Sequence, residues 1–247
     1  MRLTVCGSAG SYGSPGRACS SYLLQSDEAN VVLDCGNGSF SNLSTVIDPG
    51  KIDAVLISHS HHDHVVDLAS FFHFLRFVPS AFRRKIKLIA SASTLSSFDT
   101  IFALEFESVF DLVTVNPQSL TTLGDFHMTF FDTSHMDGSL AIRIVGLDGN
   151  CVVYTGDAGP SSELAHFSHG ANLLIGECTW IHRPARVGSG LHHDAFELGE
   201  LAKLANVDSV MVTHVAYPGD PIDASALVKG HFGGNVITAI DNLSIQL

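Results

Sequence analysis

The chain is poor in positive charge, with 13 Lys and Arg against 25 Asp and Glu in 247 residues and a formal net charge of −12. A long groove that binds nucleic acid by neutralising phosphates needs many clustered cations. This balance disfavours large structured nucleic acid as a partner and leaves a small anionic substrate open. One cluster of basic residues fits a solvated helix end and the loop after it: Arg76, Arg83, Arg84, Lys85 and Lys87.

Cysteine is sparse, and its spacing does not suggest pairing. The five cysteines are odd in number, widely separated and form no CxxC pair, namely Cys6, Cys19, Cys35, Cys151 and Cys178. This pattern disfavours a disulfide framework and a structural zinc site. No run of about 18 apolar residues indicates a membrane span, and residues 1–6 lack the apolar core of a secretory signal. We therefore expect a cytoplasmic protein with no membrane partner.

Apolar residues make up 45% of the chain and are evenly spread, which favours a single domain over residues 1–247. Short β-rich runs between turn residues open the chain at residues 3–6, 21–25 and 31–34. Later apolar runs alternate with helical patterns: strands at residues 54–57, 87–90, 126–131, 151–155, 173–176 and 209–213, and helices at residues 64–78, 162–169 and 195–205. This alternation predicts an α/β fold with helices covering the sheets.

Residues 58–64 read SHSHHDH and place four polar residues in the order HxHxDH after an apolar run, namely His59, His61, Asp63 and His64. In an extended turn His59 and His61 project to the same side, so one segment can serve two adjacent metal ions. Imidazole and carboxylate suit Zn, Mn or Fe, and zinc is our first expectation. A metal pair that activates water predicts a hydrolase.

Four apolar runs end in a residue able to bind metal or move a proton: His59, Asp157, Glu177 and His214. Active residues gather where strands end, so we expect these four at one edge of a layered sheet. His135 follows the predicted strand 126–131 in the same manner. Together, His135, Asp157 and His214 would complete two coordination spheres, with Asp157 bridging them.

The order HxHxDH, then His135, then TGD at Asp157 and THV at His214 resembles the metallo-β-lactamase superfamily over nearly the whole chain. The resemblance implies a four-layer αββα sandwich, two mixed sheets flanked by helices, that holds a dinuclear site. It implies one metal on His59, His61 and His135, the other on Asp63, His64 and His214, and Asp157 between them. Asp157 stands where many true β-lactamases place a cysteine, which disfavours antibiotic hydrolysis.

One more residue of the resemblance is Asp34, in VVLDCGNG. It matches an early strand-end aspartate that orients the metal loop without binding metal. A turn-initiating aspartate before glycine is an equal alternative.

Three segments resemble the ribonuclease Z and phosphodiesterase branch: CGSAGSYGSPGRACSSYLL, LLIGECTW, and LHHDAFELGELAKLA before VMVTH. The resemblance implies that His192 donates a proton to the leaving oxygen or stabilises the transition state, and that Glu177 orients its ring. His193 is the alternative alignment. Asp63 counts among both the ligands and the catalytic residues. The branch commonly forms homodimers, and the Phe-rich stretch 71–82 offers apolar contact.

The spacing between His135 and Asp157 leaves room only for a strand, a turn at residues 148–150 and another strand. Members of the branch that process transfer RNA carry a long substrate arm there. We therefore expect a small phosphodiester, a cyclic nucleotide or a short oligonucleotide end, attacked by a hydroxide that the two metals share. Candidate phosphate contacts are Arg17, Arg183 and Arg186, each with an ordinary surface role as the alternative. Trp180 could stack on a base or pack in the core.

Other functions are compatible with the same ligands. The site could hydrolyse another ester class, such as an aryl sulfate, a lactone or a thioester. A di-iron redox protein is a further alternative. A non-catalytic binding protein is disfavoured, because such proteins have usually lost a ligand and every position here is filled.

Overall fold

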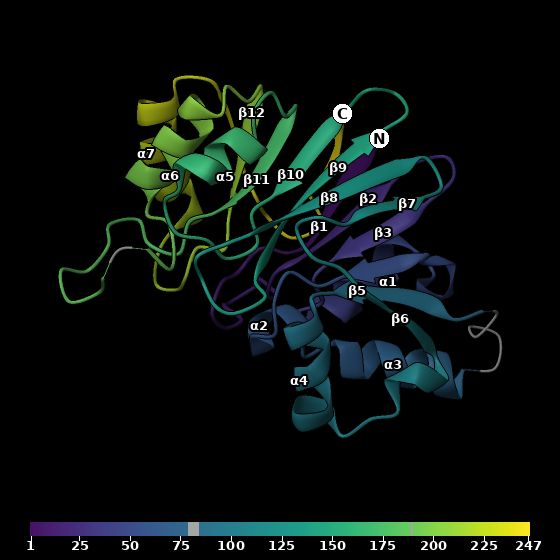
Figure 1. Cartoon of the computed structure of the whole chain (residues 1–247). Helices are drawn as coiled ribbons and strands as arrows, with labels where there is room; N and C mark the ends of the chain where they lie inside the picture. Colours follow the sequence, from purple (N-terminus) through teal and green to yellow (C-terminus); the bar gives the residue numbers. More distant parts are fainter. Residues whose placement is uncertain (79–83, 189) are drawn as a thin grey trace.

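Two sheets face each other in the computed structural model, which describes residues 1–78, 84–188 and 190–247 (Figure 1). The first sheet has the order β14-β1-β2-β3-β4-β5-β6. Antiparallel pairing joins β14 to β1, β1 to β2 and β2 to β3, and parallel pairing runs from β3 to β6. Its strands are β1 (Arg2–Gly7), β2 (Ser21–Gln25), β3 (Asn30–Leu33), β4 (Ala54–Leu56), β5 (Ile86–Ala90), β6 (Phe110–Thr114) and β14 (Ser244–Gln246).

The second sheet has the order β13-β12-β11-β10-β9-β8-β7. It is parallel from β10 to β13 and antiparallel from β7 to β10, so both sheets are mixed. Its strands are β7 (Leu120–Leu123), β8 (Phe126–Asp132), β9 (Leu140–Gly146), β10 (Cys151–Tyr154), β11 (Leu173–Glu177), β12 (Ser209–Thr213) and β13 (Asn235–Thr238).

Helices cover the outer face of each sheet, on opposite sides of the molecule (Figure 1). The first sheet carries α1 (Ser39–Val46), α3 (Leu68–Phe77) and α4 (Ala92–Phe102), with 3-10 turns η1 (Pro49–Lys51) and η2 (Phe106–Ser108). The second sheet carries α5 (Ser162–Phe167), α6 (Ala195–Leu204) and α7 (Pro221–Phe232). The predicted four-layer αββα sandwich is confirmed.

A continuous apolar core lies between the sheets, and a separate core lies under each helical layer. Strand β8 illustrates how the core between the sheets forms. Phe126, Met128 and Phe130 point inward and are buried, while His127 and Thr129 alternate outward. Each fully buried side chain of this size contributes about 1.5–3 kcal/mol. The packed sheets therefore give a rigid base for the loops at their edge.

The predicted helix 64–78 is wrong in one respect, because it divides into the one-turn α2 (His62–Val65) and α3. The break lies at Val66 and Asp67, where the Asp67 carboxylate accepts the backbone N–H of Phe40 and its own N–H donates to Cys35. This turn ties the metal motif to the loop after β3.

The Phe-rich stretch packs mainly within the chain. Phe71 and Phe72 are buried in the core under the first sheet, and Phe77 is 69% exposed. Phe82 and Arg83 lie outside the described residues, and the homodimer stays a prediction. All five cysteines are buried and free. Among the described residues, none of the helices has the length and apolar character required to cross a bilayer.

Candidate metal centre

The predicted ligands converge at one edge of the two sheets. The loop after β4 carries His59, His61, Asp63 and His64, and strand ends of the second sheet carry the others. His135 follows β8, Asp157 follows β10 and His214 follows β12. All seven residues expected to bind metal lie in two adjoining groups.

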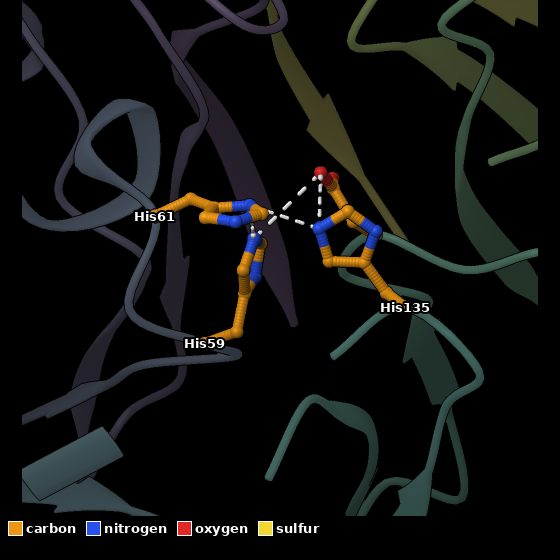
Figure 2. A group of neighbouring side chains, drawn as sticks. His59, His61 and His135 are labelled. Atoms are coloured by element: carbon orange, nitrogen blue, oxygen red, sulfur yellow. Dashed lines mark hydrogen bonds and ion pairs between the residues drawn. The ribbon is translucent and has the colours of Figure 1, made fainter. Parts of the chain in front are cut away.

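The first group contains His59, His61, His135 and Asp157, and Figure 2 shows the three histidine rings turned toward one another. His61 Nδ1 lies 3.1 Å from His59 Nε2 and 2.9 Å from His135 Nε2. Asp157 Oδ2 lies 3.7 Å from His59 Nε2 and 3.6 Å from His135 Nε2. Four potential ligand atoms therefore surround one point.

The second group contains Asp63, His64 and His214. His214 Nε2 lies 3.2 Å from His64 Nε2 and 3.1 Å from Asp63 Oδ2. Asp157 Oδ1 lies 3.3 Å from the Nε2 atoms of both His64 and His214. The two oxygens of Asp157 thus face different groups, as a bridging ligand requires.

These distances fit a metal pair. Ligands at about 2.0–2.1 Å from a tetrahedral zinc ion lie about 3.3 Å from one another, and the ligand atoms named here are 2.9–3.7 Å apart. Asp157 Oδ1 is buried and has no hydrogen-bond partner, although buried polar atoms are normally satisfied. A cation between the groups would satisfy it.

The protonation states differ between the groups. Burial lowers the pKa of His59, His61 and His135, so these rings are neutral and offer a lone pair. Burial also opposes protonation of His64 and His214, but nearby carboxylates outweigh it and raise the pKa of both: Asp157 with Asp34 for His64, and Asp157 with Asp63 for His214. Metal binding at the second group therefore has to displace protons, which makes it pH-dependent.

Hydrogen bonds fix the orientation of the rings. Asp34 Oδ2 lies 2.7 Å from His64 Nδ1, which leaves Nε2 of that ring for a metal. The same carboxylate accepts the N–H and hydroxyl of Ser58 at 2.7 Å and the hydroxyl of Tyr154 at 2.6 Å. On the other side, His135 Nδ1 lies 3.0 Å from the Leu191 carbonyl. The structure thus gives Asp34 the contacts of a residue that orients the metal loop.

The backbone around His214 has little free space. Its φ of 59° lies in the left-handed region, which non-glycine residues rarely adopt and which is frequent at functional sites. A Cβ on Gly10 would lie 2.3 Å from the His214 carbonyl and 2.4 Å from its Nδ1. Glycine is required at position 10 so that the first loop can pass the His214 ring.

A second set of contacts joins Glu177, Thr179 and His192. His192 Nδ1 lies 3.0 Å from Glu177 Oε1, and Thr179 donates its N–H and hydroxyl to Glu177 Oε2 at 2.9 Å. Thr179 Oγ1 also lies 3.0 Å from Nδ1 of both His192 and His214. Burial disfavours the His192 cation, but the hydrogen bond to Glu177 and the negative charges of Glu177 and Asp157 together outweigh it and raise the pKa of His192. Thr179 lies in the motif LLIGECTW, but no role was predicted for it, because its contacts depend on two distant loops.

The geometry separates His192 from His193. The His192 ring is 21% exposed, and its Nδ1 lies 3.7 Å from Asp157 Oδ2. The His193 ring is fully buried, with no hydrogen-bond partner on either nitrogen. Of the two, His192 is therefore the histidine that a substrate could reach.

The candidate arginines lie in different surroundings. Arg183 Nη1 donates to Glu197 Oε1 at 2.8 Å, and its Nη2 donates to the His192 carbonyl. Arg17 donates to the Val215 carbonyl at 3.3 Å, and Arg186 is exposed in the loop before α6. Arg183 is thus engaged within the chain rather than free for a phosphate.

The fold and this His and Asp cluster define a metallo-β-lactamase-fold protein of the ribonuclease Z-like branch, with the site of a metal-dependent hydrolase. Both the superfamily and the branch were predicted from the sequence and are confirmed. Over residues 1–203 the chain matches the family described as "Anti-Pycsar protein Apyc1", and it belongs to that family.

Named relatives agree with this assignment. The "Probable metallo-hydrolase YhfI" of Bacillus subtilis is 30% identical over 237 residues, covering 96% of each chain. The crystal structure of YhfI matches with a TM-score of 0.88 at 28% identity and covers 99% of this chain and 98% of that one. Ribonuclease Z of Methanococcus maripaludis is 22% identical over 91% of each chain. The crystal structure of human tRNase Z, short form, shares the fold with a TM-score of 0.74 at 20% identity, over 100% of this chain and 99% of that one.

Proposed function

We propose that the protein is a dinuclear metal-dependent phosphodiesterase that acts on a small phosphodiester, a cyclic nucleotide or a short oligonucleotide end. The observation that carries this proposal is Asp157, whose two oxygens each face a separate group of histidines. Two divalent ions bound there would polarise phosphoryl oxygens and lower the pKa of a water molecule so that it is nucleophilic near neutral pH. The names metallo-hydrolase and ribonuclease Z among the relatives support this chemistry.

The ligand assignment follows the two groups. His59, His61 and His135 would hold one ion, Asp63, His64 and His214 would hold the other, and Asp157 would contribute to both. Imidazole and carboxylate without thiolate suit zinc, and manganese and iron are the alternatives.

His192 acts as the general acid in this proposal. Its Nδ1 faces Glu177 and Thr179, which leaves Nε2 to hold a proton for the departing ester oxygen. Glu177 stabilises the imidazolium and fixes the ring, while Thr179 links this pair to the ring of His214.

The fold and the charge of the chain support a small substrate. Strands β9 and β10 are joined by a tight turn in which Asp148 accepts the backbone N–H of Asn150 at 3.0 Å. This connection leaves no arm between His135 and Asp157 for a folded RNA, and the net charge of −12 repels a long polyanion. Location in the cytoplasm and pairing as a homodimer remain part of the proposal.

The test measures metal content and ester preference in the same preparation. Elemental analysis of protein purified without added metal should give two divalent ions per chain. Turnover of a bis-aryl phosphodiester should exceed that of aryl sulfate and lactone probes. Preference for the sulfate or the lactone would replace the phosphodiesterase with a hydrolase of that ester class. A di-iron centre with visible absorption would favour redox chemistry.

A further inference from the structure

Two tyrosines lie side by side in the apolar core between the sheets. Tyr22 belongs to β2 of the first sheet and Tyr154 to β10 of the second, and both side chains are buried. Their ring centroids are 5.1 Å apart, with an angle of 55° between the ring planes. A phenol hydroxyl in such a core needs a hydrogen-bond partner, because it has lost its bonds to water. Each hydroxyl finds that partner across the sandwich, on the opposite sheet.

The Tyr154 hydroxyl reaches the first sheet. It donates to Asp34 Oδ2 at 2.6 Å, and Asp34 is the residue directly after β3. The same oxygen lies 2.7 Å from Nδ1 of His64, whose Nε2 faces the second group of metal ligands. Tyr154 therefore supports a proposed ligand of the second ion through a single carboxylate, although it belongs to the other sheet.

The Tyr22 hydroxyl crosses in the other direction, from the first sheet to the second. It lies 2.6 Å from Oγ1 of Thr213, which is the last residue of β12, and His214 follows directly. The Ser8 carbonyl accepts the His214 N–H at 3.0 Å and lies 3.5 Å from Thr213 Oγ1. Tyr22 thus holds the strand end from which the other histidine of the second group projects.

Both crossing contacts end at unusual backbone. Asp34 and His214 have φ angles of 58° and 59°, in the left-handed region that non-glycine residues rarely adopt. Such a conformation persists only where the surrounding contacts determine it. Asp34 is bonded to a tyrosine of the opposite sheet, and His214 directly follows a residue that is. Burial raises the pKa of both tyrosines, so their hydroxyls keep their protons at neutral pH.

The first group of metal ligands is reached less directly. Asp34 accepts the hydroxyl of Ser58, and that hydroxyl lies 3.0 Å from His59 Nδ1. Among the described residues, neither tyrosine bonds to a partner of the His61 or His135 ring. The contacts of the two tyrosines therefore converge on the second group.

We propose that Tyr22 and Tyr154 are positioning residues for the second ion, because their hydroxyls, reaching across the sandwich, hold His214 and His64 in the geometry that binds it. This inference rests on the proposed function, since it takes the site to hold two ions. It makes the affinity of the second group depend on contacts between the sheets, whereas the first group depends on its own loops. Loss of the two hydroxyls should therefore weaken binding of one ion and spare the other.

Stepwise removal of zinc tests this assignment. Zinc-loaded protein is equilibrated with increasing concentrations of a chromogenic chelator, and His61→Ala and His214→Ala identify the release steps of the first and second groups. Tyr22→Phe and Tyr154→Phe should each weaken the second-group step about tenfold and leave the first-group step within about twofold. Equal weakening of both steps, or no change in either, would overturn the proposal.

Thr4→Val is the matched control for loss of a buried hydroxyl. Thr4 is buried in β1, and its hydroxyl bonds to that of Ser244 on β14, within the first sheet and without contact to a ligand ring. This variant should lower the melting temperature as the tyrosine variants do, while both zinc steps stay unchanged. A loss at the second group similar to that of the tyrosine variants would attribute the effect to general destabilisation and overturn the proposal.

Thr213→Val tests the route from Tyr22 by removing the partner and keeping the tyrosine. It should weaken the second-group step as much as Tyr22→Phe, and the double variant should add nothing, because both changes break the same bond. Tyr22→Phe combined with Tyr154→Phe should instead multiply the two losses, since the hydroxyls hold different histidines. Multiplied losses in the Tyr22 and Thr213 double variant would overturn the route through Thr213.

Zinc affinity is measured without a substrate, which separates this proposal from the phosphodiesterase proposal. Two zinc steps with a selective loss in the tyrosine variants, but no turnover of the bis-aryl phosphodiester, would support the positioning role and overturn the phosphodiesterase. Phosphodiester turnover with two zinc steps and no selective loss would do the reverse. A single zinc step in the unmodified protein would overturn both, because no second ion would remain to be positioned.

Discussion

The two sheets contribute to the metal centre in different ways. The first sheet supplies four of the proposed ligands from one loop after β4, supported from the end of β3 by Asp34. The second supplies single residues from separate places: His135, Asp157 and His214 after strands, Glu177 at the end of β11, and His192 in the segment before α6. Loss of one shared support should therefore affect all four proposed first-sheet ligands together. A substitution of a second-sheet residue should affect only the contacts of that residue.

Asp157 is the second-sheet residue that contacts both groups, so its loss should have the largest effect. Asp157→Ala should reduce kcat/KM at least about a thousandfold, since the ions it holds stabilise several kcal/mol of transition-state charge. Elemental analysis should show fewer than two ions per chain. The control is Asp137→Ala, an exposed acid in the loop that carries His135, which should keep both ions. Two tightly bound ions in Asp157→Ala would show that Asp157 is no bridge.

Substitutions of His192 and His193 test whether catalytic activity can be lost while both metal ions stay bound. His192→Ala should lower kcat about a hundredfold to ten-thousandfold with two ions retained, as expected for a lost general acid. His193→Phe fills a similar buried volume, loses no hydrogen bond of the ring and should leave kcat within a few-fold. Loss of an ion from His192→Ala would make His192 a ligand, which its position near Asp157 and His214 also permits.

Substitution of Asp34 tests whether the metal-binding loop after β4 depends on one shared support. Asp34→Asn weakens the contacts to Ser58, His64 and Tyr154 together and should reduce metal affinity about tenfold to a hundredfold. Asp67→Asn is the matched control, because Asp67 accepts the Phe40 N–H at the start of α1 and contacts no ligand ring. Competition with a chromogenic chelator measures both. Equal affinities in the two variants would refute the role of Asp34.

The same difference between the sheets explains what the sequence revealed. The proposed first-sheet ligands are close together in the chain, so the HxHxDH spacing alone predicted them. His135, Asp157, Glu177 and His214 were predicted because each follows an apolar run, and parallel strands bring such ends to one edge, whereas His192 was implied by the family resemblance. Thr179 escaped notice, because its contacts to His192 and His214 depend on how two loops fold over each other.

Several helices also escaped notice, for a related reason. The sequence of α4, ASTLSSFDTIF, is rich in Ser and Thr and has weak helix propensity, so its stability comes from Phe98 packing on the first sheet. The break between α2 and α3 was hidden because no Gly or Pro marks it. Asp67 makes that break through a contact with α1, which is absent from the local sequence. The single domain over residues 1–247 stays a prediction.

The pH dependence of kcat tests the pairing of His192 with Glu177. Burial lowers the pKa of His192, but Glu177 and Asp157 together outweigh burial, so the pKa lies above the ordinary value of about 6.5. An acid must be protonated, and kcat should therefore fall as the pH rises through this raised pKa. Glu177→Gln removes the raising contact, so the falling limb should move to lower pH in a kcat profile. An unmoved limb would show that His192 does not supply the proton.

Substitution of Arg183 should have the smallest effect on kcat. It distinguishes a structural role of Arg183 from binding of the substrate phosphate. It forms an ion pair with Glu197, in which the side chains are 12% and 18% exposed, and it donates to the His192 carbonyl. Arg183→Gln should lower kcat about fivefold, the equivalent of about 1 kcal/mol for a partly buried pair, with KM unchanged. Glu197→Gln should do the same, and the double variant should add nothing, because both changes release the same loop. If Arg183 bound the substrate phosphate instead, Arg183→Gln would raise KM and Glu197→Gln would not.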